Sequence, residues 1–250
     1  FNQLTKLAHK HNCFLKFEAA VAGGIPIIKV VNECLLANNI SSIIGIFNGT
    51  CNYILSRMLA EKESFDSCLG EAQALGYAEA DAHFDVDGLD TAHKLALLSS
   101  FAFNSEVSLK TVYTQGIRDV SLEDIQAAEA FGYKIKLLGI ARLTCAGVEQ
   151  RAQPCLINED SSLARVDGVS NAIVLHTDLL SELFLSGPGA GGLATASAVI
   201  ADVLDIQRGI NTHKAFSLHP STAPLQNLPP QMHEEFSSYF VRLRVQDKSG

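Results

Sequence analysis

Residues 76–103 read GYAEADAHFDVDGLDTAHKLALLSSFAF, an acidic segment that leads directly into an apolar helical pattern. Five carboxylates fall within twelve residues of this stretch: Glu79, Asp81, Asp85, Asp87 and Asp90. The helical pattern then carries one ammonium group, Lys94, among alanines and leucines. An acidic surface loop does not need to end in such a helix. The stretch therefore predicts a polar pocket that lies against a hydrophobic core.

Asp90 and Lys94 carry the chemistry that this pattern suggests. They are four residues apart with the acid first, so on a helix their side chains share one face within hydrogen-bonding distance. A lysine in this setting can protonate a developing alkoxide or hold a carbonyl oxygen. Glu79 and Asp85 could bind a substrate ammonium group. An ordinary surface salt bridge, which contributes little to stability, explains the same spacing.

Length and composition limit the classes of protein. The chain has 250 residues, of which 47% are hydrophobic and 18% charged, so it can bury a sizeable core. A net charge of −8 disfavours nucleic-acid binding, and no apolar run reaches the roughly 18 residues of a membrane span. The six cysteines lack Cys-x-x-Cys spacing, which predicts reduced core thiols in a cytoplasmic protein.

Hydrophobic periodicity and capping residues predict interleaved helices and strands. We expect helices at 4–12, 26–36, 52–62, 64–75, 90–103, 121–131 and 193–208, and strands at 14–21, 40–47, 135–144, 148–157, 172–177, 182–186 and 239–245. This order predicts an α/β (α+β layered) fold, in which a mixed β-sheet has helices packed mainly on one face. The polar, proline-containing residues 211–235 are typical of a linker.

Two glycine-rich segments could approach a ligand. Residues 187–192, GPGAGG, match G-x-G-x-x-G, but no strand follows the next helix, so they do not open a Rossmann unit. Their bare backbone N–H groups could still face a cofactor held by another domain, or simply allow close packing. In residues 21–26, VAGGIP, backbone carbonyls could bind a monovalent cation.

Five segments resemble homoserine dehydrogenases, and they occur in the same order as in that family. The matching segments are residues 17–28, 45–55, 76–103, 130–139 and 187–192. The similarity covers about residues 1–210. It implies reduction of L-aspartate 4-semialdehyde to L-homoserine with NADPH or NADH, on the route to threonine, methionine and isoleucine.

The resemblance also implies roles for individual residues. Lys94 matches the catalytic lysine, and Asp90 matches its partner. The implied substrate contacts are Glu79, Tyr77, Asp85, Thr50 and Gly49. The implied cofactor contacts are Gly189, Asn48 and Thr50. The implied sodium or potassium site is built largely from backbone carbonyls of Glu18, Val21, Gly23 and Ile25.

The resemblance divides the chain into three parts. Residues 1–210 match the catalytic and dimerisation domain, 211–235 a linker, and 236–250 the start of a truncated ACT-like regulatory domain. The family's nucleotide-binding domain is absent, so we expect a fragment that is inactive alone. The apolar stretch 174–184 matches a dimerising region, which predicts a homodimer or homotetramer that acts on a small-molecule substrate.

Two other functions remain open from the residues. One is a metal- or carboxylate-dependent lyase or hydrolase that uses Glu79, Asp81, Asp85 and Asp87. The other is a dimerising amino-acid-binding module without catalysis, whose acidic loop senses a ligand.

Overall fold

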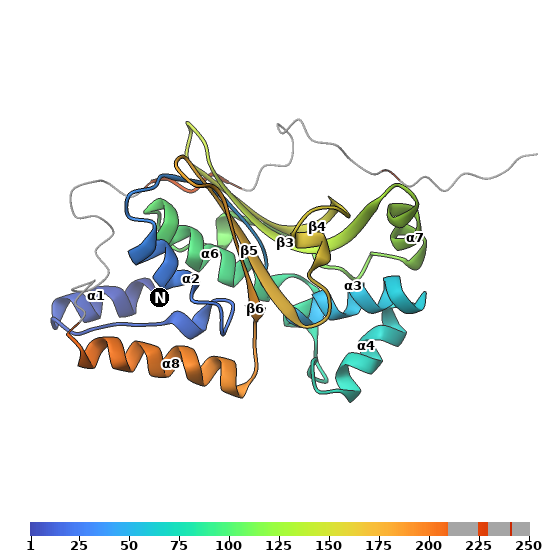
Figure 1. Cartoon of the computed structure of the whole chain (residues 1–250), viewed down its shortest axis with the longest axis horizontal. Helices are drawn as coiled ribbons and strands as arrows, with labels where there is room; N and C mark the ends of the chain where they lie inside the picture. Colours follow the sequence, from blue (N-terminus) through green and yellow to red (C-terminus); the bar gives the residue numbers. More distant parts are fainter. Residues whose placement is uncertain (210–224, 230–240, 242–250) are drawn as a thin grey trace, which may run out of the picture.

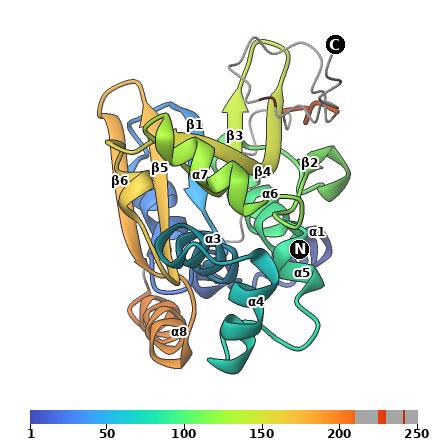
Figure 2. The ribbon, with the colours of Figure 1, turned by 90° about the vertical axis from the view of Figure 1, so that its right-hand side faces the viewer.

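A mixed six-stranded sheet forms the centre of the molecule. The computed structural model describes residues 1–209, 225–229 and 241. The strands lie in the order β2-β4-β3-β1-β5-β6 (Figure 2). Their bounds are β1 Ile40–Ile46, β2 Val112–Thr114, β3 Tyr133–Leu143, β4 Val148–Asn158, β5 Ser170–Thr177 and β6 Ser181–Pro188. β2 and β4 run parallel and the other neighbours antiparallel, which confirms the predicted mixed sheet.

The helices gather at two ends of this sheet. Their bounds are α1 Asn2–Lys10, α2 Ile27–Lys29, α3 Gly49–Glu61, α4 Phe65–Ala74, α5 His83–Val86, α6 Leu89–Phe103, α7 Leu122–Ala130 and α8 Gly192–Gln207. Figure 1 shows α1, α2 and α8 at one end, and α3, α4 and α7 at the other. No helix in the described part of the chain is long and apolar enough to cross a membrane.

Alternation along the strands sends different side chains to the two faces of the sheet. Ile43 of β1 and Ile173 of β5 pack with Leu95 and Leu98 of α6 in the largest core cluster. The opposite face carries a smaller cluster that includes Val174. The prediction that helices pack mainly on one face is therefore confirmed.

Capping residues fix several helix boundaries that the sequence predicted. Ser64 accepts a hydrogen bond from the backbone N–H of Ser67 at the start of α4. Ser121 and Asp124 form a reciprocal capping box at the start of α7. Such caps satisfy N–H groups that have no partner inside the helix.

The strand expected at 14–21 is wrong. Only a short 3₁₀ turn, η1 Glu18–Ala20, forms there. The backbone N–H of Glu18 donates to Asp202 of α8 at 2.9 Å, so α8 takes the hydrogen bond that a neighbouring strand would have taken. The helix expected at 26–36 is shorter and changes pitch, because α2 passes into the π-helix η2 Val30–Cys34.

The helix expected at 52–62 begins earlier than predicted. Asn48 caps α3, and the helix begins at Gly49. All six cysteines are free, but only Cys51 and Cys68 are buried, so the prediction of core thiols is wrong for the others. Residues 225–229 lie beside β4, where Leu228 donates to the Val148 carbonyl. The rest of the predicted linker and the strand at 239–245 lie outside the described residues.

Candidate active site

Lys94 lies on α6 with its ammonium group held at two points. Nζ donates to Asp90 Oδ2 at 2.7 Å and to the carbonyl oxygen of Phe47 at 3.0 Å. Its side chain is 23% exposed, so the group is fixed yet still reachable. The predicted pairing with Asp90 is confirmed, and the second acceptor comes from the loop between β1 and α3.

Asn48 joins three helices at this point. Its Nδ2 group donates to Asp85 Oδ1 at 2.7 Å and to Asp90 Oδ2 at 2.8 Å. Its Oδ1 atom accepts from the backbone N–H of Cys51 at 2.8 Å and so caps α3. The amide thus separates two carboxylates that would otherwise face each other. These bonds engage both ends of the Asn48 side chain, and the predicted cofactor contact at this residue stays a prediction.

Asp85 is a half-buried carboxylate within this network. Burial is the main cause that raises the pKa of Asp85 above its usual value, and the neighbouring charge of Asp90 adds to it. The hydrogen bond from Asn48 acts in the opposite direction. A substrate ammonium group beside Asp85 would favour its ionised form and strengthen its own binding.

The first turn of α3 is held close to its neighbours. Thr50 Oγ1 donates to the carbonyl oxygen of Tyr77 at 2.7 Å, which ties α3 to the acidic segment. A Cβ atom at Gly49 would lie 2.6 Å from the carbonyl oxygen of Val169, so only glycine fits there. Glu79 is exposed, and the bonds described above do not include it. Its predicted role in substrate binding stays a prediction.

The glycine loop packs tightly against the same region. A Cβ atom at Gly189 would lie 2.0 Å from Cγ of Asn171, and one at Gly23 would lie 2.4 Å from the Gly189 carbonyl oxygen. Further along, Gly191 and Gly192 have open space around their Cα atoms and begin the 16-residue helix α8 without a side-chain cap. Close packing therefore explains Gly189, and the expected cofactor contact of this loop, Gly189 included, stays a prediction.

The predicted cation-binding residues include one buried carboxylate, Glu18. Glu18 accepts from the backbone N–H groups of Ile28 and Lys29 at 2.8 and 2.9 Å. Burial raises its pKa to about 7. Val21 and Ile25, which follow Glu18 in the sequence, are also buried. Gly23 has a φ of +50°. Among the described residues, no cluster of three or more His, Cys, Asp or Glu side chains has a metal-binding arrangement, which leaves the metal-dependent lyase without a site there.

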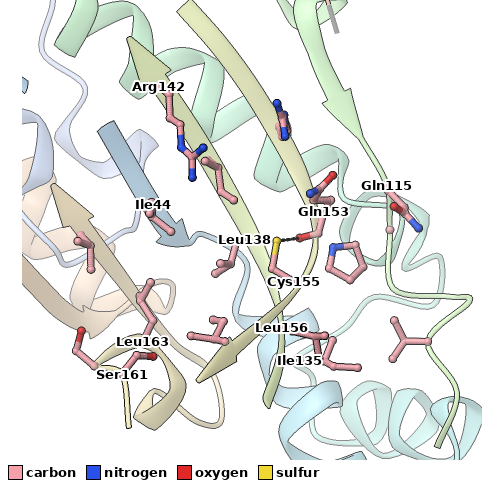
Figure 3. A pocket seen from close by; sticks show the side chains of 18 of the residues that line it. Ile44, Gln115, Ile135, Leu138, Arg142, Gln153, Cys155, Leu156, Ser161 and Leu163 are labelled. Carbon is pink, nitrogen blue, oxygen red and sulfur yellow. Dashed lines mark hydrogen bonds between the residues drawn. The ribbon is translucent and has the colours of Figure 1, made fainter. Parts of the chain in front are cut away.

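A wide hollow lies away from Lys94. It has a volume of about 750 Å³ and lies on the face of the sheet opposite α6. Figure 3 shows Ile44, Leu138 and Leu163 pointing into it, with Cys155 beside them. Apolar and charged side chains both line it, and the residues that hold Lys94 are not among them.

Sequence reasoning missed three parts of the site. The bridging role of Asn48 had a signal, because asparagine before Gly-Thr is a common helix N-cap. The carbonyl oxygen of Phe47 and the buried amide of Asn171, which donates to it at 3.0 Å, had none. Their positions depend on contacts between distant segments.

Comparison with known proteins agrees with this geometry. The model of the family described as homoserine dehydrogenase matches residues 26–204. The homoserine dehydrogenase of Neisseria gonorrhoeae is 46% identical over 100% of this chain and 58% of its own length. That of Pseudomonas aeruginosa is 43% identical, with the same coverage. The chain therefore spans little more than half the length of these curated relatives.

Solved structures give the same result. A homoserine dehydrogenase from Thiobacillus denitrificans superimposes with a TM-score of 0.84 at 43% identity, over 92% of this chain and 54% of that one. A hyperthermophilic archaeal homoserine dehydrogenase in complex with NADPH has a TM-score of 0.72 at 31% identity, over 83% of this chain and 60% of that one. The family model, the close relatives and the shared fold together show that the chain belongs to the homoserine dehydrogenase family.

Proposed function

We propose that this chain supplies the substrate-binding and proton-donating part of an enzyme that reduces L-aspartate 4-semialdehyde to L-homoserine. One observation carries the proposal. The Lys94 ammonium group is fixed between Asp90 and the Phe47 carbonyl, one amide away from the half-buried Asp85. This arrangement can protonate a carbonyl oxygen and hold a substrate amine at the same time. Lys94→Ala in the full-length protein tests it, because kcat should then fall by about 100-fold or more.

The residues divide the work of the reaction. A bound nicotinamide cofactor, NADPH or NADH, supplies the hydride to the aldehyde carbon. Lys94 gives a proton to the oxygen of that aldehyde, and the hydrogen bond to Asp90 holds the ammonium group in position until then. The open backbone of Gly191 and Gly192 at the start of α8 fits the negative or amide groups of such a cofactor.

Asp85→Asn in the full-length protein should raise KM for the semialdehyde by about 10-fold to 100-fold, because a charge-assisted contact to the substrate amine is lost. In the wild type, KM should rise as the pH falls and Asp85 becomes protonated. Because the pKa of Asp85 is raised, this rise should begin at a higher pH than for an ordinary aspartate. Steady-state oxidation of NADPH across pH 5 to 8 measures both effects.

Asp81 gives the matched control for this experiment. It is an exposed carboxylate of the same acidic segment, and it bonds only locally to the backbone N–H of His83. Asp81→Asn should keep KM within about 2-fold of the wild type. An unchanged KM in Asp85→Asn, or an equal change in both variants, would contradict the proposed amine contact.

We also propose that sodium or potassium binds through the carbonyls of Val21, Gly23 and Ile25, beside Glu18. The support is the buried carboxylate of Glu18, whose pKa is raised to about 7 by burial even though the backbone N–H groups of Ile28 and Lys29 donate to it. Above pH 7 the ionised group destabilises the fold by about 3 kcal/mol relative to its unfolded state. A cation at these oxygens would offset that cost.

The cation proposal predicts a pH-dependent change in Tm. Without the cation, stability should fall as the pH rises from about 4.5 through 7, because the folded state binds the Glu18 proton more tightly than the unfolded state does. KCl in place of choline chloride at equal ionic strength should raise Tm by about 3 °C or more at pH 8. The rise should be smaller at pH 6, where the proton competes. Glu18→Gln should remove this difference, and equal Tm values in both salts would refute the proposal.

We propose a homodimer that forms through the open face of the sheet. The hollow on that face supports it, because the partly exposed apolar side chains of Ile44, Ile140 and Leu156 line it. A second copy could cover these side chains. Size-exclusion chromatography with light scattering should give a dimer for the wild type and a monomer for Ile140→Glu. Leu36→Glu, at an exposed site outside both this face and residues 174–184, should stay dimeric. A monomeric wild type would disprove this interface.

A further inference from the structure

The buried side chain of Asn171 links the glycine loop to the proton donor. Asn171 lies on β5, is only 1% exposed, and donates from Nδ2 to the carbonyl oxygen of Phe47 at 3.0 Å. The same oxygen accepts the 3.0 Å hydrogen bond from Lys94 Nζ. One carbonyl therefore receives a donor from β5 on one side and the Lys94 ammonium on the other.

The glycine loop fixes the amide from another direction. Gly189 lies so close to the amide of Asn171 that a Cβ atom on Gly189 would come within 2.2 Å of both Nδ2 and Oδ1. In the sheet, Asn171 pairs with Gly187, and β6 runs from there into the loop and α8 (Figure 1). The loop backbone thus covers the amide and limits its rotation.

The oxygen atom of the Asn171 side-chain amide lacks the hydrogen bond that its nitrogen makes. Oδ1 of Asn171 is buried and has no hydrogen-bond partner among the described residues. Rotating the amide by half a turn would point this oxygen at the Phe47 carbonyl, where two acceptors would repel each other. A buried acceptor without a partner destabilises a fold, so its presence requires an explanation other than stability.

We propose that Asn171 is a positioning residue that holds the Phe47 carbonyl in place and thereby aims the Lys94 ammonium at the substrate. This inference rests on the proposed function of Lys94 and adds to it. With the carbonyl fixed, Lys94 has two acceptors and one orientation. Without Asn171, the peptide between Phe47 and Asn48 can turn, and Asp90 alone cannot fix the direction of the donated proton.

Asn171→Leu in the full-length protein separates this role from stability. Leucine has nearly the same shape, removes the Nδ2 donor and also removes the unpartnered Oδ1 atom. Tm should therefore stay equal or rise, while kcat falls by about 10-fold because the proton donor is misaligned. KM for the semialdehyde should change by less than about 2-fold, because Asp85 is untouched. Thermal unfolding and steady-state kinetics measure the two effects.

A double-mutant cycle with Lys94→Ala gives the decisive test. If Asn171 acts through Lys94, Asn171→Leu should lower kcat by less than about 2-fold once Lys94 is alanine. Gln150→Met is the matched control, because Gln150 is a buried amide on β4 whose Oε1 atom accepts from Ser99 Oγ instead. Its effect on kcat should be the same factor in both backgrounds.

Several results would overturn the inference. They are a kcat within about 2-fold of the wild type in Asn171→Leu, or an equal loss in both backgrounds. If the leucine variant does not fold, kcat of Asn171→Ala is measured in both backgrounds instead, and the same two outcomes would overturn the inference. An unchanged kcat in Lys94→Ala alone would instead refute the proposed function, so the two failures are distinguishable.

Discussion

Lys94→Ala in the full-length protein is expected to lower kcat for semialdehyde reduction by about 100-fold or more, because a proton donor at the developing alkoxide contributes at least that much. The ammonium group is fixed at 2.7 Å from Asp90 and 3.0 Å from the Phe47 carbonyl, and the alanine variant removes it from both contacts. Steady-state NADPH oxidation with saturating substrate measures the change.

A second substitution distinguishes proton donation from charge alone. Lys94→Arg keeps the positive charge, but a guanidinium group does not release its proton at neutral pH. We expect Lys94→Arg to lose kcat nearly as fully as the alanine variant. Lys62→Ala, which removes a surface partner of Glu129, serves as the control and should leave kcat within about 2-fold. A Lys94→Ala enzyme within about 10-fold of the wild type would contradict the role of this residue.

Lys136→Met should produce the largest loss of stability. Lys136 is 2% exposed, and its Nζ donates to Asn52 Oδ1 at 2.9 Å, the Val166 carbonyl at 2.7 Å and Asp167 at 2.8 Å. Methionine fills the space but leaves buried acceptors without a donor, which should lower the free energy of unfolding by about 2–3 kcal/mol. For a domain of this size, Tm should fall by roughly 5–10 °C in thermal unfolding.

Lys134 gives a matched control on the same strand. It lies two residues away on β3 and also pairs with Asp167, at 3.3 Å, but both side chains of that pair are partly exposed. Lys134→Met should change the free energy of unfolding by about 0.5 kcal/mol or less. Equal Tm values for the two variants would contradict this prediction. The buried hydrogen bonds of Lys136 would then not stabilise residues 166–169, the segment that packs against Gly49.

Much of the candidate site was predictable because it is local. Asp90 and Lys94 are one helical turn apart, so the geometry of a single helix brings them together wherever that helix lies. The same holds for the capping box at Ser121 and Asp124. The strands from β3 to β6 were also predictable, because alternation along an extended chain is a property of the strand itself.

The failed prediction at 14–21 shows where this reasoning stops. The segment is apolar enough for a strand, but the backbone of Glu18 bonds to Asp202, which is 184 positions away. A short window of sequence contains no information about such a partner. The same limit applies to the thiols, since Cys51 is buried by α3 and its neighbours, whereas Cys13, Cys34 and Cys145 are exposed.

The amino-acid sequence by itself determined the helix that bears the acid and the ammonium group, the strands β1 and β3 to β6, and the resemblance to a family. Only the tertiary structure decided that Asn48 bonds to both Asp85 and Asp90. It also decided that Lys94 and Asn171 both donate to the Phe47 carbonyl. The physical reason is the range of the forces involved. Helix and strand patterns depend on neighbours within a turn or two, whereas the hydrogen bond from Asn171 to Phe47 joins residues 124 positions apart and exists only because β1 and β5 pair in the sheet.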